Sequence, residues 1–196
     1  MKRIVAVLMV VCFMFLLASC VRVYEIPENN LPQKPDENGI DQPSQGEETD
    51  IPEEPEVTEV TLTLYFPDND ALYLHPEIRT VEIPVEEPIE YAVVRELFKG
   101  PVNPELSPAL TGEKLVNSIV VHDGGECVID FKRDFVILNT GGSTRETFVL
   151  GSIVNSLCEL EYINAVAFTV EGKGNVEFGH TIIESALKPM PELIKK

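Results

Sequence analysis

A cluster of potentially reactive side chains lies in the stretch HDGGEC, residues 122–127. His122, Asp123, Glu126 and Cys127 belong to residue types that bind zinc or form Cys/His nucleophiles. The Asp-Gly-Gly sequence within the stretch is a strong hairpin signal, so the four side chains should point in different directions. The chain contains neither a CxxC pair nor an HExxH helix. We therefore predict no metal site, no cofactor and no catalytic residue here.

Two carboxylates, Asp130 and Asp134, are the nearest candidates for glycan hydrolysis. That reaction requires two acids roughly 5 to 10 Å apart, one of them in an apolar pocket that raises its pKa. In the run CVIDF, Asp130 alternates with Ile129 and Phe131, so its side chain should face solvent or cap a turn. A peptidoglycan hydrolase using acidic residues is therefore the alternative function, and the prediction is that the protein is not an enzyme.

The sequence Gly141-Gly142-Ser143 precedes a helix-like run and has the glycine content of a phosphate-binding loop. It lacks the lysine and the flanking strand pattern of such loops, so we interpret it as a flexible turn. Ser143 and Glu146 have the spacing of a capping box, which predicts that a helix begins here.

The N-terminal segment has the layout of an export signal. Lys2 and Arg3 are followed by an uncharged run over residues 4–18, which as a helix would measure roughly 22 Å and is too short to span a membrane. We predict a signal peptide at residues 1–19. The sequence LASC resembles the bacterial lipobox, in which a diacylglyceryl group is attached to the cysteine, here Cys20. An ordinary signal peptide with an incidental cysteine is the alternative.

Residues 20–57 are predicted to be a disordered linker behind the lipidated cysteine. Residues 21–57 contain eleven Asp or Glu, six Pro and only two basic residues. Such a composition cannot bury enough apolar surface to offset the entropy of ordering. The lipid would hold the mature chain on the extracytoplasmic face of the cell membrane, with the linker as a tether.

Residues 58–196 are long enough for a single domain with its own core. Hydrophobic alternation predicts a strand at 60–66, one or two strands within 71–84 interrupted near Pro76, and a hairpin across 114–131. Helical spacing predicts helices at 88–99 and 144–160, and alternation returns at 165–173. This order predicts the α+β class: a twisted mixed or antiparallel sheet with two helices packed on one face.

The charge and the cysteines of this domain limit its partners and its chemistry. The domain is acidic and has no basic cluster, which argues against nucleic acid as a partner. Cys127 and Cys158 remain after the signal and the lipid site are removed, and the sequence leaves open whether they are free or bridged. A catalytic Cys/His pair would need His75 or His180 to approach one of them in space.

The succession of segments resembles the GerMN domain of sporulation and spore germination. The resemblance covers most of residues 60–185 and is carried by LYFPDNDALYLHPEIRTV, VRELFKGP, SIVVHDGGECVIDFKRDF, LGSIVNSL and AVAFTVEGK. One departure is the stretch NSLCE, where the family usually has threonine in place of Ser156 or Cys158. The resemblance implies a noncatalytic module on the outer surface of the membrane, used in building or germinating the spore envelope.

The leading interpretation is a membrane-anchored extracytoplasmic binding or scaffold module whose partner is an envelope protein or peptidoglycan. An exposed sheet face is the expected contact surface. Its residues are Thr61, Thr63, Tyr65, Val128 and Asp130. Besides the hydrolase, a solute-binding lipoprotein is a second alternative, although such proteins usually close two lobes around a ligand and this domain is too short for two.

Overall fold

The computed structural model describes residues 56–196. The signal peptide, Cys20 and all but the last two residues of the linker lie outside the described residues. The described elements are β1 (Val57–Pro67), β2 (Leu74–Pro84), α2 (Ile89–Lys99), β3 (Val116–Val121), β4 (Glu126–Phe131), α3 (Arg133–Asn139), α4 (Ser143–Leu157), β5 (Ala165–Val170), β6 (Val176–Phe178), β7 (Thr181–Ile183) and a 3₁₀ helix (Pro191–Leu193). The α+β class and the single domain are confirmed.

The first two strands form a long antiparallel ribbon. Pairing runs from Val57 opposite Pro84 to Pro67 opposite Leu74. The expected interruption near Pro76 is not present. Among the described residues β2 forms its ladder with β1, and its other edge makes a single bridge, from Leu74 to Ile194, so a proline without an N–H is tolerated there. The alternation of more buried and more exposed side chains therefore continues along the whole of β2.

The remaining strands form two further sheets. β3 pairs antiparallel with β4, β4 pairs parallel with β5, and β6 pairs with β7 as a short hairpin. The arrangement differs from the expected single sheet, since the described strands divide into three sheets. A parallel pair needs a long crossover, and α3 and α4 supply it between β4 and β5.

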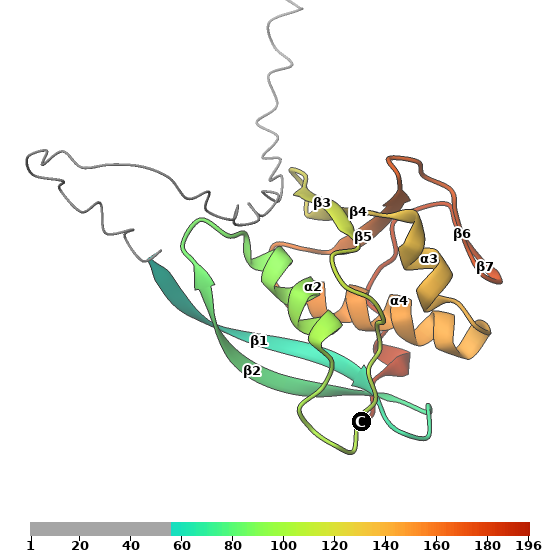
Figure 1. Cartoon of the computed structure of the whole chain (residues 1–196), viewed down its shortest axis with the longest axis horizontal. Helices are drawn as coiled ribbons and strands as arrows, with labels where there is room; N and C mark the ends of the chain where they lie inside the picture. Colours follow the sequence, from blue (N-terminus) through green and yellow to red (C-terminus); the bar gives the residue numbers. More distant parts are fainter. Residues whose placement is uncertain (1–55) are drawn as a thin grey trace, which may run out of the picture.

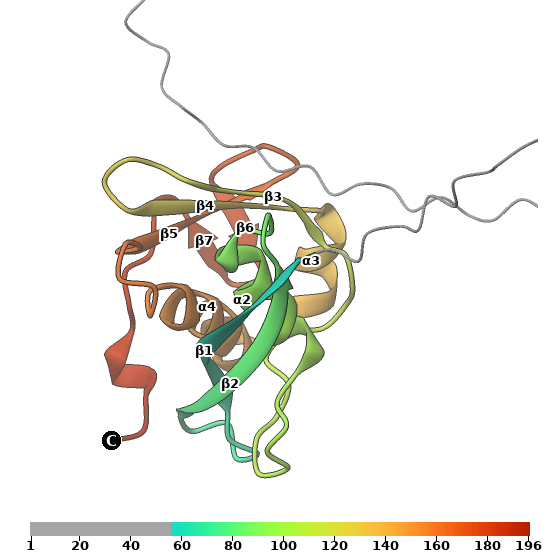
Figure 2. The same ribbon diagram turned by 90° about the vertical axis from the view of Figure 1, so that its left-hand side faces the viewer.

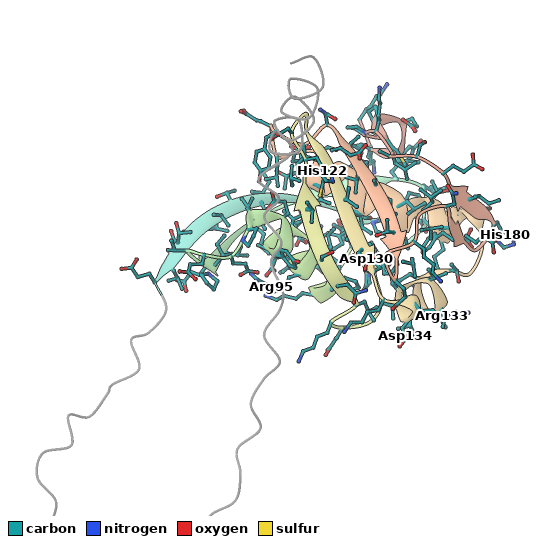
Figure 3. All side chains as sticks on the ribbon, turned by 90° about the horizontal axis from the view of Figure 1, so that it is seen from above. Arg95, His122, Asp130, Arg133, Asp134 and His180 are labelled. Atoms are coloured by element: carbon teal, nitrogen blue, oxygen red, sulfur yellow. The ribbon has the colours of Figure 1, made fainter. Side chains whose placement is uncertain are left out.

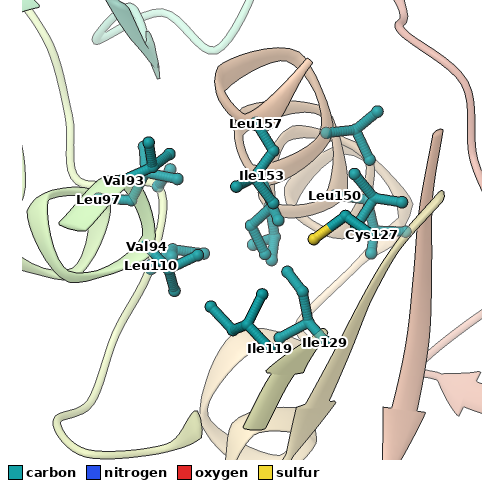
Figure 4. Close-up of a cluster of buried hydrophobic side chains, with 14 of the residues drawn as sticks. Val93, Val94, Leu97, Leu110, Ile119, Cys127, Ile129, Leu150, Ile153 and Leu157 are labelled. Carbon is teal, nitrogen blue, oxygen red and sulfur yellow. The ribbon is translucent and has the colours of Figure 1, made fainter. Parts of the chain in front are cut away.

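The helices α2 and α4 lie between the β1–β2 ribbon and the β3–β4–β5 sheet (Figures 1 and 2). This position differs from the expected packing of both helices on one face of one sheet. The core fills the space between these layers. Figure 4 shows apolar side chains of α2, α4, β3 and β4 converging there: Val93, Val94, Leu97, Ile119, Cys127, Ile129, Leu150, Ile153 and Leu157. Each large aliphatic side chain buried in this way contributes about 1.5–3 kcal/mol.

The long helix α4 is covered on several sides. The unpaired edge of β1 lies against it, and the Tyr65 N–H donates to Ser156 Oγ at 2.9 Å. The C-terminal segment, residues 184–196, lies along another side, where the Met190 N–H donates to Asn155 Oδ1 at 2.7 Å. Residues 148–157 of α4 are all buried. The predicted helix at 144–160 is thus confirmed, with bounds shifted by one to three residues.

α3, the β6–β7 hairpin and the 3₁₀ helix were not predicted. α3 follows β4 directly, and its Phe135 ring stacks on Phe131 with ring centroids 3.8 Å apart. Phe178, in the β6–β7 hairpin, also stacks on the Phe135 ring, with ring centroids 5.6 Å apart. These elements are too short to give a recognisable hydrophobic period, so packing rather than local pattern defines them.

Candidate functional site

The five residues of the predicted partner-binding face lie on two different sheets. Thr61, Thr63 and Tyr65 belong to β1, whereas Val128 and Asp130 belong to β4. Thr61 is exposed on the outer face of the ribbon, where its hydroxyl lies 3.3 Å from that of Thr80. The five residues therefore do not form one face, and binding by either group remains a prediction.

Tyr65 is a structural residue in this arrangement, with 7% of its surface exposed. Its hydroxyl donates to Glu159 Oε1 at 2.6 Å, and burial together with this carboxylate raises the pKa of Tyr65 to about 12. Its backbone N–H donates to Ser156 Oγ at 2.9 Å. The Ser156 hydroxyl therefore satisfies this N–H on the edge of β1.

Asp130 is held by three hydrogen bonds on the outer face of the β3–β4–β5 sheet. Its carboxylate accepts from Thr169 Oγ1 at 2.6 Å, Asn117 Nδ2 at 2.9 Å and the Gly172 N–H at 2.7 Å. Burial opposes ionisation, but these donors outweigh it and lower the pKa of Asp130. A general acid for glycan hydrolysis needs the opposite shift. The geometry thus gives no support to Asp130 as that acid, and Asp134 is exposed on the first turn of α3 (Figure 3).

The cluster around the β3–β4 turn is separated as the sequence predicted. His122 is exposed near the turn (Figure 3), whereas Cys127 points into the core and is fully buried. Cys127 and Cys158 are free thiols, and burial raises their pKa values to about 12 and about 11. Among residues 56–196, no three His, Cys, Asp or Glu side chains are grouped so as to hold a metal ion.

The glycine-rich turn before α4 is closed by a carboxylate of the helix itself. Glu146 Oε1 accepts from the Gly142 N–H at 3.2 Å and lies 3.4 Å from the Gly141 nitrogen. Glu146 is fully buried and also accepts from the His180 N–H at 2.9 Å. Burial opposes its ionisation, but these donors lower the pKa of Glu146. The helix begins at Ser143 with Gly142 as its N-cap, so the predicted Ser143–Glu146 capping box is not formed: Ser143 makes no capping bond, and Glu146 accepts from Gly142 instead.

An apolar groove lies between α2 and the start of β3. It has a volume of about 510 Å³. Tyr91, Val94 and Phe98 form one wall, and Leu115 and Val116 form the other. Its ends and rim carry Pro84, Glu87, Arg95, Lys99, Glu113 and Lys114. Apolar concavities with a few polar groups at the rim are the usual form of binding sites.

The groove runs beside a strand edge that is unpaired in the described structure. β3 pairs with β4 on one side only. On its other side the Ile119 N–H donates to Tyr91 Oη at 3.0 Å, so this edge faces α2. The Ile119 N–H of this edge is therefore already satisfied by α2, and the groove meets β3 only at Val116.

An ion-pair network fixes the C-terminal half of α2. Glu96 is 2% exposed, and its carboxylate accepts from Arg79 Nη1 at 2.8 Å and from Lys99 Nζ at 2.6 Å. Arg79 also contacts Glu77 and donates to the Gly100 carbonyl at 2.9 Å. Burial opposes ionisation of Glu96, but Lys99 and Arg79 lower its pKa overall. The network ties α2 to β2, which holds one wall of the groove in place.

This groove was not predicted from the sequence. The predicted apolar stripe of α2 runs through Ile89, Val93 and Leu97, and it faces the core. A second set, Tyr91, Val94 and Phe98, recurs at intervals of three and four residues on the neighbouring flank. That excess of apolar surface on a short helix was the available signal.

The domain is of the α+β class, with two helices between a β-ribbon and a mixed three-stranded sheet. Comparison with known protein families identifies the family to which it belongs. Residues 63–176 match the model of the Germane family, described as sporulation and spore germination. The chain belongs to this family of GerMN domains. No curated protein shows significant sequence similarity to it.

Solved GerMN structures share the fold. The tandem GerMN domains of the sporulation protein GerM from Bacillus subtilis match with a TM-score of 0.54 and 18% identity over 69% of this chain. The match spans 47% of that structure, about half its length. The first GerMN domain of the same protein matches with a TM-score of 0.52 and 18% identity, covering 68% of this chain and 98% of that one. Within residues 56–196 no helix is long and apolar enough to cross a membrane.

Proposed function

We propose that the chain is a lipid-anchored binding module that acts outside the cell membrane in sporulation or spore germination. The α2–β3 groove is its contact surface for an envelope protein. The family supports the process, and the lipobox-like LASC sequence supports anchoring through Cys20. The role is recognition rather than catalysis.

The observation that carries this proposal is the groove itself. Its walls contain an aromatic and aliphatic surface, in which Phe98 and Val116 are half-buried and Tyr91, Val94 and Leu115 are shared with the core. Contacts that fill such a pocket with apolar groups usually supply most of the affinity of an interface. Peptidoglycan is a less suitable ligand for these walls, because glycans offer few apolar groups.

The proposal is tested by blocking the groove in the organism that encodes the protein. Val116→Arg replaces a half-buried wall residue and fills the groove, and Phe98→Ser removes part of the opposite wall. We expect each variant to reduce sporulation or germination roughly tenfold or more, at matched protein levels and with the fold retained by circular dichroism. Cys20→Ser should cause a similar loss, because it removes the anchor.

The matched control is Val102→Arg, since Val102 is 79% exposed and lies outside the groove. Thr61→Arg and Val128→Arg test the two halves of the face predicted from the sequence. Normal sporulation and germination in both folded groove variants would refute the groove as the contact surface. A loss confined to Thr61→Arg or Val128→Arg would assign the function to that surface instead.

A further inference from the structure

We propose that the open edge of β2 binds an extended, basic segment of a partner protein, which pairs with the β1–β2 ribbon as a third strand. The open edge consists of the backbone groups of Ile78, Thr80 and Glu82 that point away from β1. This inference goes beyond the proposed function, because a different surface from the walls of the groove carries it. The partner is recognised by backbone hydrogen bonds and by the charge of its side chains.

The direction of these backbone groups follows from the pairing of β2 with β1, because hydrogen bonding alternates along an antiparallel pair. Tyr65 lies opposite Pro76, and the Tyr65 N–H donates to Ser156 on α4, so this pair is not hydrogen-bonded across the ribbon. Every second residue of β2 therefore presents its N–H and C=O groups to the outer edge. The Leu74 carbonyl points the same way, since it accepts the Lys195 N–H at 3.0 Å.

The open part of the edge begins at Ile78. The C-terminal segment occupies the edge beside Leu74, and Pro76 has no N–H to offer. No hydrogen bond from residues 56–196 reaches the outward backbone groups of Ile78, Thr80 or Glu82. Their side chains are exposed, and no other described element lies along the outer edge of β2 over its second half (Figure 1). Such an edge is a template for another strand.

The exposed face of the ribbon beside this edge is acidic. Glu59 lies directly opposite Glu82, and neither carboxylate forms an ion pair within residues 56–196. Like charges in directly opposite positions destabilise a sheet. A Lys or Arg side chain on a third strand lies next to Glu82 and offsets this repulsion. A second copy of the acidic domain would bring the same two carboxylates instead, so the charge favours a basic segment.

The three edge residues define the side chains that suit the segment. Directly opposite residues of neighbouring strands share one face of the sheet. The segment therefore places a cation opposite Glu82, a small polar side chain opposite Thr80 and an aliphatic side chain opposite Ile78. The Thr80 hydroxyl lies 3.3 Å from that of Thr61, so the middle of this face is polar. Ile78 is 74% exposed, and an aliphatic neighbour removes part of its apolar surface from water.

Fluorescence anisotropy with the mature lipoprotein in detergent tests the charge of the occupant. The probe is the capped, labelled peptide Lys-Thr-Lys-Thr-Thr-Thr-Val-Thr, whose third, fifth and seventh residues lie opposite Glu82, Thr80 and Ile78. We expect Glu82→Lys to weaken its binding roughly tenfold or more, and to favour the same peptide with both Lys replaced by Glu. Thr80→Val, which keeps the backbone N–H, is the matched control and should bind as the wild type does.

Backbone pairing is tested in the peptide itself, so that the result does not depend on the fold of a variant. N-methylation of its fifth residue removes an N–H that points to β2, whereas N-methylation of its fourth residue removes one that points away. We expect the first methylated peptide to bind roughly tenfold or more weakly than the second. Thr80→Pro removes the corresponding donor from the protein and should cause a similar loss while the thermal midpoint is retained.

Equal affinities for the two methylated peptides would overturn the strand pairing and assign the binding to charge alone. Equal affinities for the Lys and Glu peptides, or no saturable binding of either, would reject a basic segment as the occupant. Sedimentation of the protein without peptide gives a further result. A dimer that Thr80→Pro dissociates would assign the edge to a second copy of the chain and so overturn the proposed partner.

Discussion

The two main helices differ in how completely the rest of the domain covers them. α4 lies against β1 and the C-terminal segment, and its residues 148–157 are all buried. α2 buries most of its apolar residues, Tyr91 and Val94 included, but leaves Phe98 half-buried at the groove beside β3. A helix covered on several sides contributes mainly stability, and the exposed residues of α4 are confined to its first turns. The half-covered flank of α2 therefore marks the part of the domain where recognition can take place.

The largest expected effect comes from placing a charge inside the covered helix. Leu157 is fully buried in the core, so Leu157→Asp leaves an unpaired carboxylate without water. We expect a loss of about 4 kcal/mol or more, enough to unfold most of the protein at 25 °C. Chemical denaturation followed by circular dichroism measures it. Val102→Asp, at a position 79% exposed, should remain folded, and a folded Leu157→Asp would show that α4 is less tightly covered than described.

The turn that closes on the start of α4 should be the next most sensitive position. Gly179 has a φ of +62°, and a Cβ there would lie 2.0 Å from Glu146 Oε1. Gly172 has a similar φ of +71°, but a Cβ there would meet nothing within 4 Å. We expect Gly172→Ala to cost about 1 kcal/mol from backbone strain alone, and Gly179→Ala roughly 2–4 kcal/mol. Equal thermal midpoints for the two variants would contradict the tight approach of Glu146.

Two serines one turn apart on α4 allow a smaller effect to be measured. Ser156→Ala leaves the buried Tyr65 N–H without an acceptor and should cost about 1–3 kcal/mol. Ser152→Ala removes a buried hydroxyl that has no hydrogen-bond partner among the described residues, so it should be neutral or slightly stabilising. Urea unfolding of both variants tests the difference. A greater loss in Ser152→Ala would mean that Ser156 does not hold the edge of β1.

The smallest effect is expected on α2, at the exposed end of its ion-pair network. Lys99 is exposed, so Lys99→Met should cost about 0.2–1 kcal/mol at pH 7. Glu96 has a lowered pKa in the folded state, so its contribution is present above its unfolded pKa of about 4.3 and is lost as pH falls through the folded value. The difference between wild type and Lys99→Met should therefore shrink between pH 7 and pH 3. Lys188→Met is the control, and a constant difference would exclude the Glu96 linkage.

The sequence predicted which segments form strands and helices better than it predicted how they pair. Alternation in β1 and in β4 places Leu64 and Ile129 on buried faces, because a strand's period is local information. Which sheet each strand joins depends on contacts far along the chain. For this reason Thr63 and Val128 were assigned to one face although they lie on two sheets.

The buried acids were missed for a related reason. A glutamate looks solvent-exposed in a sequence, and only its distant partners make its burial tolerable. Glu96 is compensated by Arg79 from β2, and Glu146 by backbone donors near His180. The groove could not be predicted from the sequence, because the partial burial of Phe98 depends on where the loop before β3 packs. Core positions can thus be read from periodicity, whereas compensated charges and concave surfaces require the fold.

The small cluster of Tyr65, Leu74 and Phe148 has a consequence for folding kinetics. Leu193 and Ile194 complete this cluster, and Leu74 bridges Ile194, which lies 120 positions later in the sequence. Contacts between such remote positions raise the contact order, and domains of high contact order fold in milliseconds to seconds. Until that closure, an apolar patch on the ribbon and on α4 stays open to proteases and chaperones. The interval in which the nascent domain is vulnerable is therefore set by the arrival of its C-terminal segment rather than by the strength of its core.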